Sequence, residues 1–205
     1  MTKIILVRHG HVEGIDPPRF RGRTELPLTK IGMRQAQQTA QRIAAHLNPL
    51  SLYTSPMGRC VATGQAISEL IGTRGQILED LNDLNYGTWQ GRSYEDVRAE
   101  CPELFALWFA SPHLVRFPRG DSLQDLVARA GDALRFVRDR HREETVVMVG
   151  HDSVNRALLL QLIEQPLAAY WRLEQSPCAI SEIAITGARV CVHRINETGH
   201  LDGTR

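Results

Sequence analysis

Two histidines, each placed just after a short apolar run, are the residues of this chain best suited to chemistry. His9 comes one arginine after the run at 3–7, and His151 comes one glycine after the run at 145–149. Both runs are rich in β-branched residues, which is typical of buried strands. Because ligands bind at the carboxyl ends of strands in open α/β sheets, the two histidines are expected to share one site.

Arginines follow the same kind of strand end and predict an anion site. Arg8 ends the first run, and Arg59 comes shortly after a second expected strand at 50–53. Ser55 is expected to cap a helix whose first residue is Pro56, which places Arg59 in the first helical turn. Free backbone N–H groups at a helix N-terminus bind anions together with a guanidinium group. A solvated surface position is the plain alternative for Arg59.

The loop at 79–91 is acidic at first and then aromatic and glycine-rich. Asp83 lies in it close to Tyr86 and Trp89. Removal of water from a carboxyl group raises its pKa and fits it to act as a general acid. Ordinary turn chemistry is the alternative interpretation of these aspartates and asparagines.

Together these residues suit phosphoryl transfer, which depends mainly on positioning and on stabilisation of negative charge. His9 is the expected nucleophile, because neighbouring guanidinium groups lower the pKa of an imidazole and keep one nitrogen unprotonated. Asp83 is the expected donor of a proton to the leaving alkoxide, and its ionised form would then activate water. Arg8, Arg59 and His151 are expected to bind the phosphate.

A metal-dependent hydrolase is the rival interpretation, because five residues of this region are of types that bind metals: His9, His11, Asp83, His151 and Asp152. Arg8 and Arg59 argue against it, since they would place cations beside a divalent ion. Gly10 also breaks the strand before His11. No metal ligand and no cofactor is therefore predicted.

The whole chain has the composition of one globular domain. It has 205 residues, of which 42% are hydrophobic, and a formal net charge of +1. A single domain over 1–196 and a flexible polar tail over 197–205 are expected. Charges of both signs are interspersed, so neither nucleic acid nor a membrane surface is an expected partner. No apolar run is long enough for a signal sequence or a membrane span, which predicts a cytoplasmic protein.

The periodicity of the chain predicts alternating strands and helices. Thr29, Ser93 and Ser122 precede helical patterns as N-caps. The runs at 178–185 and 189–195 predict two closing antiparallel strands. An α/β fold with a mostly parallel sheet is therefore expected.

Five stretches in this order resemble the histidine phosphatase superfamily, which has the phosphoglycerate mutase-like fold: Leu6 to Gly10, Arg19 to Thr29, Ser55 to Arg59, Tyr86 to Gly91, and Val149 to His151 followed by Arg156. The resemblance implies a three-layer α/β/α sandwich with a mostly parallel central sheet. It also implies that His9 is phosphorylated and that Arg8, Arg59 and His151 bind phosphate.

The chain departs from the family pattern at some positions. The family's acid is usually Glu, and the matching residue here is Asp83. The shorter side chain of Asp83 places the carboxyl group roughly an ångström further from the substrate. A displacement of this size can lower the rate about a hundredfold. Shortly after Gly10, His11, Val12 and Ile15 stand where the family has polar residues. Arg21 or the backbone near Gly22 is expected to supply the missing substrate contact.

These observations predict a metal-independent phosphomonoesterase that acts on a small phosphorylated metabolite. A phosphoglycerate mutase-type transferase, or a degenerate member that binds a phosphorylated ligand or a protein, is the alternative. Arginines such as Arg19 and Arg23 favour a substrate with a second anionic group, whereas Trp108 and Phe117 favour an aromatic one, and the sequence does not rank the two. A homo-oligomer is compatible with the sequence.

Overall fold

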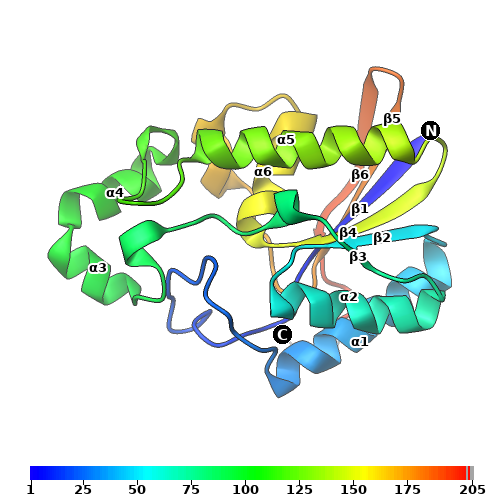
Figure 1. Cartoon of the computed structure of the whole chain (residues 1–205), viewed down its shortest axis with the longest axis horizontal. Helices are drawn as coiled ribbons and strands as arrows, with labels where there is room; N and C mark the ends of the chain where they lie inside the picture. The colour runs from blue at the N-terminus through cyan, green and yellow to red at the C-terminus, as the bar shows by residue number, and fades with distance from the viewer. Residues whose placement is uncertain (202, 204–205) are drawn as a thin grey trace.

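A single mixed sheet forms the centre of the computed structural model, which describes residues 1–201 and 203 (Figure 1). Within these residues the sheet has six strands in the order β3-β2-β4-β1-β5-β6. The strands are β1 (Thr2–Arg8), β2 (Ser51–Thr54), β3 (Gln76–Ile77), β4 (Thr145–Gly150), β5 (Ile180–Thr186) and β6 (Arg189–Glu197). The pairs β1–β4, β2–β4 and β2–β3 are parallel, whereas β5 is antiparallel to both β1 and β6.

Helices cover both faces of this sheet (Figure 1). One face carries α1 (Lys30–His46) and α2 (Gly58–Ile71), and the other carries α5 (Leu123–Arg140) and α6 (Asp152–Leu162). Two short helices, α3 (Tyr94–Glu100) and α4 (Pro102–Ala110), lie together at one end of the molecule. The expected three-layer α/β/α sandwich is therefore confirmed.

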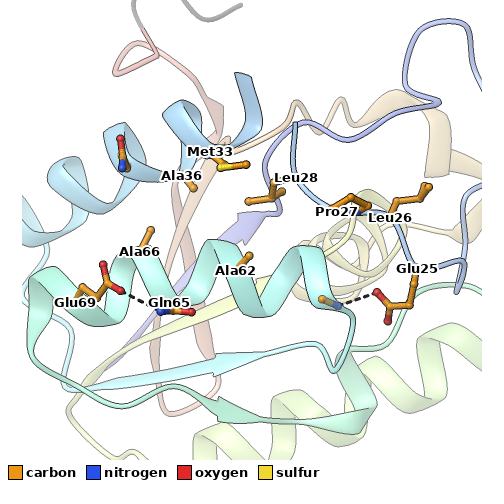
Figure 2. Close-up of a pocket in the computed structure, with 12 residues that line it drawn as sticks. Glu25, Leu26, Pro27, Leu28, Met33, Ala36, Ala62, Gln65, Ala66 and Glu69 are labelled. Carbon is orange, nitrogen blue, oxygen red and sulfur yellow. Dashed lines mark hydrogen bonds between the residues drawn. The ribbon is translucent and has the colours of Figure 1, made fainter. Parts of the chain in front are cut away.

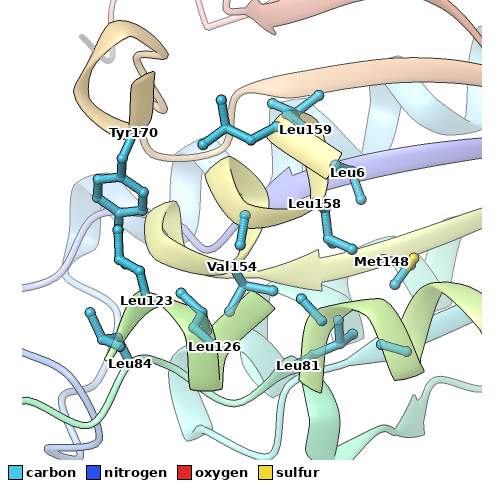
Figure 3. Packing of buried hydrophobic residues seen from close by; sticks show 14 of the residues in the cluster. Leu6, Leu81, Leu84, Leu123, Leu126, Met148, Val154, Leu158, Leu159 and Tyr170 are labelled. Carbon is cyan, nitrogen blue, oxygen red and sulfur yellow. The ribbon is translucent and has the colours of Figure 1, made fainter. Parts of the chain in front are cut away.

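The alternation of side chains along β1 divides the core between the two layers. Ile4 and Leu6 pack with residues of α5 and α6, as Figure 3 shows for Leu6, whereas Ile5 and Val7 pack with residues of α1 and α2. Successive strand residues point to opposite faces, so an unbroken apolar run is what a strand covered on both sides requires. Complete burial of one such side chain stabilises the fold by about 1.5–3 kcal/mol.

The N-termini of the helices show which of the predicted N-cap residues are correct. Thr29, Ser93 and Ser122 each accept a hydrogen bond from a backbone N–H in the first turn of α1, α3 and α5, as expected. The cap predicted at Ser55 is wrong, because α2 begins at Gly58 after Met57, which makes no side-chain cap bond. The Ser55 hydroxyl accepts from the N–H of Met57 over 3.3 Å, before the helix begins, and lies 2.8 Å from Nε2 of His151.

The described residues of the predicted tail, 197–201 and 203, include several that contact the rest of the chain. Glu197 still belongs to β6, and the hydroxyl of Thr39 lies 2.9 Å from Nε2 of His200. Leu201 is only 2% exposed and packs in an apolar cluster that includes Val12. Positions 202, 204 and 205 lie outside the described residues. Across the residues that are described, no helix has the combination of length and apolar composition that a bilayer crossing needs.

Candidate active site

The two histidines meet because their strands are neighbours. Arg8 of β1 stands opposite Gly150 of β4 in the parallel ladder, and the backbone N–H of His9 donates to the Gly150 carbonyl over 3.0 Å. The rings of His9 and His151 are consequently 5.3 Å apart, edge to face. The expectation that both strand ends build one site is consistent with this geometry.

The ring of His9 is held in its neutral form. Its side chain is buried, and Nδ1 lies 2.7 Å from the carbonyl oxygen of Gly10. A carbonyl only accepts, so Nδ1 carries the proton and the lone pair is on Nε2. Burial lowers the pKa of His9 well below its usual value, and the charges of Arg59 and Arg8 add to this effect. An unprotonated Nε2 is the form that the nucleophilic role predicted from the sequence requires.

Gly10 is required by the close approach of α1. A Cβ at this position would lie 2.5 Å from the carbonyl oxygen of Gly32, a backbone atom that has no room to move aside. The N–H of Gly10 donates to the hydroxyl of Thr63 over 3.1 Å. The backbone that carries the His9 ring is thus fixed from both α1 and α2.

Arg8 and Arg59 present buried donors with no acceptor. Arg59 is fully buried and donates to the carbonyls of Thr24 (2.9 Å) and Gly22 (2.5 Å). Arg8 donates to the carbonyl of Gln175, and burial lowers its pKa to about 10, which leaves it cationic at neutral pH. Within residues 1–201 and 203, the Nε atoms of both arginines are buried and have no partner. Buried donors of this kind are costly unless an anion accepts from them.

Asp83 is buried next to these cations. Its Oδ2 accepts from Nη2 of Arg59 over 3.0 Å, and its Oδ1 accepts from the Ser153 hydroxyl (2.5 Å) and the Leu84 N–H (2.8 Å). Burial raises the pKa of Asp83, and the Arg59 charge only partly opposes this rise. The structure therefore brings the expected acid into the same cluster as His151, whose Nδ1 is 3.4 Å from Oδ2.

The main chain of Asp83 is also held in place by hydrogen bonds. Its carbonyl accepts from Nε of Arg23 over 3.0 Å and from Nη2 of Arg129 over 3.2 Å. Asp121 contacts both arginines, at 3.2 Å and 3.6 Å. These bonds fix the position of a carboxyl group that is one methylene shorter than the family's usual glutamate.

His151 contacts protein groups through both ring nitrogens. Nε2 lies 2.8 Å from the Ser55 hydroxyl, and Nδ1 lies 3.2 Å from Nη2 of Arg59. Burial and the Arg59 charge lower the pKa of His151 well below its usual value, so the ring is neutral. Its position beside His9 suits the phosphate-binding role expected from the sequence, which stays a prediction.

The segment that carries Arg21 and Gly22 wraps around Arg59. Gly22 has a φ of +46° and supplies one of the carbonyls that bind Arg59. Arg21 donates to the Gly14 carbonyl over 2.6 Å, and its Nη2 is 4.0 Å from Oδ2 of Asp152. Both residues border the site, and their contact with a substrate stays a prediction.

The ring of His11 turns away from this cluster. Its Nδ1 lies 3.0 Å from the hydroxyl of Thr29, the residue that caps α1. In the part of the chain that is described, no three His, Cys, Asp or Glu side chains are grouped as a metal site. The geometry gives no support to the metal-dependent alternative.

The site contains residues that sequence reasoning missed. Ser153 lies two positions after His151 on α6, and this spacing is the signal that links it to the site. Gln175 contributes only its backbone carbonyl, for which the sequence holds no signal. A separate pocket with a volume of about 590 Å³ is lined by residues of α1 and α2 and by Leu26 and Leu28. Figure 2 shows the side chains that line it. None of the expected catalytic or phosphate-binding side chains lines it.

Comparison with known proteins agrees with this geometry. Residues 4–198 match the family model of the histidine phosphatase superfamily (branch 1). The chain belongs to the histidine phosphatase superfamily. Phosphoserine phosphatase 1 of Hydrogenobacter thermophilus is 32% identical over 202 residues, which cover 98% of this histidine phosphatase and 95% of that relative.

Two further relatives extend the likeness of this histidine phosphatase. A metal-independent phosphoserine phosphatase of Arabidopsis thaliana is 30% identical over 166 residues, 80% of this chain and 70% of that one. The solved structure of Bacillus stearothermophilus YhfR superposes with a TM-score of 0.93 at 26% identity, covering 98% of this chain and all of that chain (100%). The protein is a metal-independent phosphomonoesterase, and the mutase and binding-module alternatives are not favoured.

Proposed function

We propose that this histidine phosphatase hydrolyses a small phosphomonoester through a phosphohistidine on Nε2 of His9. The observation that carries this mechanism is the unprotonated Nε2 of His9 next to two buried arginines whose Nε donors lack acceptors. A phosphoryl group between them would receive the nucleophile on one side and hydrogen bonds on the other.

The first step transfers the phosphoryl group to the enzyme. Nε2 of His9 forms a bond to phosphorus while the bond between phosphorus and the ester oxygen breaks. The Arg8 and Arg59 guanidinium groups stabilise the charge on the phosphoryl oxygens. Asp83, whose pKa is raised by burial, gives its proton to the leaving alkoxide, which departs as an alcohol.

The second step regenerates the enzyme. The Asp83 carboxylate accepts a proton from water, whose oxygen bonds to phosphorus as the bond to His9 breaks. Inorganic phosphate leaves, and His9 is neutral again. No metal enters either step, since the arginines and the neutral histidines supply the donors and the nucleophile.

O-phosphoserine is the substrate that we propose first. Two relatives at 30% identity or more are named as phosphoserine phosphatases. Phosphoserine is a small phosphomonoester with a second anionic group, which the arginines around the site suit. A cytoplasmic location and a homo-oligomeric state stay predictions from the sequence.

The mechanism is tested by phosphate release from a panel of phosphomonoesters in excess EDTA. The wild type is compared with His9→Ala and with His193→Ala. His193→Ala is the control variant, because it removes an exposed histidine of β6. We expect release by the wild type and His193→Ala and none by His9→Ala. Mass spectrometry after rapid quenching should find the phosphoryl group on the peptide that contains His9. Release by His9→Ala at the wild-type rate would refute the mechanism.

A further inference from the structure

Asp152 lies beside the phosphate-binding residues, yet the reaction proposed above does not use it. It follows His151 directly and is the first residue of α6. Its side chain is 23% exposed, and its Oδ2 lies 3.3 Å from Nη1 of Arg156 and 4.0 Å from Nη2 of Arg21. Both of these arginine contacts go to Oδ2.

A carboxylate at this position needs an explanation, because it repels the phosphate that the site must bind. Burial alone would raise the pKa of Asp152, but the charges of Arg8, Arg156 and Arg21 outweigh burial and hold the pKa well below its usual value. Asp152 is therefore charged whenever substrate enters. Its negative charge opposes any purely anionic substrate and favours one that also carries a cation.

Asp152 is not needed to hold its arginine neighbours. Arg156 donates from Nε to the carbonyl of Leu173 over 2.7 Å, and its guanidinium carbon lies 5.2 Å and 5.0 Å from the ring centres of Tyr170 and Trp171. Arg21 is anchored on the carbonyl of Gly14. Both guanidinium groups keep these anchors without the carboxylate, which argues against a purely structural role for Asp152.

We propose that Asp152 determines specificity by binding an ammonium group of the substrate. This inference rests on the proposed function, which places the phosphate between His9, Arg8 and Arg59. The ammonium of O-phosphoserine is separated from phosphorus by two carbons and the ester oxygen, and Asp152 is the residue next to His151. The flanking guanidinium groups of Arg21 and Arg156 suit the carboxylate on the same carbon. The substrate class is thus an amino-acid phosphomonoester.

Two substrates of nearly the same shape test whether Asp152 binds the ammonium group of the substrate. O-phosphoserine and 3-phosphoglycerate differ only by an ammonium or a hydroxyl group on the central carbon. We compare kcat/KM for both in the wild type, in Asp152→Asn and in Asp132→Asn. The last variant is the control, since it removes an exposed carboxylate of α5 that pairs with Arg135. The preference for phosphoserine should fall about ten- to a hundredfold in Asp152→Asn, the range for a hydrogen bond between charged groups. Asp132→Asn should keep the wild-type preference.

The other outcomes overturn the inference in distinguishable ways. An equal loss on both substrates would make Asp152 a counter-ion for the arginines, and an unchanged preference would show that it does not contact the substrate. A wild type without preference for phosphoserine would reject the inference while leaving the phosphatase mechanism intact. Absence of release from every ester would instead reject the proposed function.

A second pair of substrates needs no variant and covers the case in which Asp152→Asn does not fold, as judged by circular dichroism. Phosphoethanolamine and 2-hydroxyethyl phosphate differ by the same exchange of ammonium for hydroxyl but carry no carboxylate. The wild type should prefer phosphoethanolamine. Equal turnover of the two would contradict the role of Asp152 independently of any substitution.

Discussion

Nη2 of Arg59 lies 3.0 Å from Oδ2 of Asp83, and both side chains are almost completely buried. This ion pair joins an expected phosphate-binding residue to the expected proton donor. Burial raises the pKa of Asp83, and the positive charge of Arg59 opposes this rise. A phosphate bound to Arg59 partly neutralises that charge, so the pKa of Asp83 rises further. Substrate binding and protonation of the acid are therefore coupled by one hydrogen bond.

Replacement of Asp83 tests its role as the acid. Asp83→Asn keeps the size of the side chain but cannot donate a carboxylic proton to an alkoxide. We expect kcat for phosphoserine to fall about 10²- to 10⁴-fold, the usual contribution of general acid–base catalysis. The transfer step with p-nitrophenyl phosphate, measured as the burst of nitrophenolate, should fall far less, because that leaving group departs without a proton. An equal loss of both transfer rates would show that Asp83 only positions Arg59.

Ser153 should tune the pH range of the enzyme. Its hydroxyl donates to Oδ1 of Asp83 and stabilises the ionised carboxylate. Ser153→Ala removes this donor, so the pKa of Asp83 rises and the acid stays protonated to higher pH. The basic limb of the kcat/KM profile should then move to higher pH, whereas Ser68→Ala, a serine within α2, should leave it in place. A shift to lower pH would contradict the assignment of this limb to Asp83.

Acid should destabilise the fold through its buried histidines. The pKa values of His9 and His151 are lowered well below the usual value near 6.5. The unfolded chain therefore binds protons that the folded one does not, and stability present above pH 6.5 is lost as the pH falls below it. Each histidine contributes at most about 1.4 kcal/mol per pH unit.

The measurement is the free energy of unfolding by urea between pH 7.5 and 5. The raised pKa of Asp83 acts in the opposite sense, since it favours the folded state at lower pH. His151→Gln should flatten the dependence between pH 6.5 and 5. A His151→Gln variant whose free energy of unfolding falls with pH as steeply as that of the wild type would contradict the neutral state of His151 in the folded protein.

Arg8 should bind phosphate through several N–H donors of its planar guanidinium group. Arg8→Lys keeps a positive charge but has no Nε donor and only a point-like ammonium group. Inorganic phosphate should raise the melting temperature of the wild type, because it binds the folded state. We expect at least about tenfold weaker phosphate binding in Arg8→Lys, as a loss of a charge-assisted hydrogen bond implies. Arg135→Lys, an exchange on the exposed face of α5, is the matched control and should bind phosphate like the wild type.

The parts of the fold that depend on residues close together in the sequence could be predicted from the sequence. Thr29 and Ser122 begin helices because their hydroxyls bond to N–H groups three positions away. The two apolar runs that precede His9 and His151 form the strands β1 and β4. Local patterns are sufficient for such features, since the interactions that decide them lie within a few residues.

The features that could not be predicted depend on distant contacts. The Ser55 hydroxyl, which is the predicted cap of α2, also contacts His151, 96 positions away. The carbonyl of Gln175 fixes Arg8 across 167 positions. Leu201, in a segment whose composition predicts a flexible tail, is buried in the cluster that contains Val12. No local spacing indicates which distant residue supplies each partner.

The position of β1 in the sheet has a consequence for biosynthesis. β1 leaves the ribosome well before its two neighbours in the sheet, which are β4 and β5. Synthesis of the residues between Arg8 and Thr145 takes about 7 to 30 s at the usual rates of translation. Over that time the apolar run at 3–7 has no partner strands and is a target for chaperones or for aggregation. Catalytic activity can therefore appear only after β4 and β5 have been synthesised, and chains that stop before β5 should be inactive and poorly soluble.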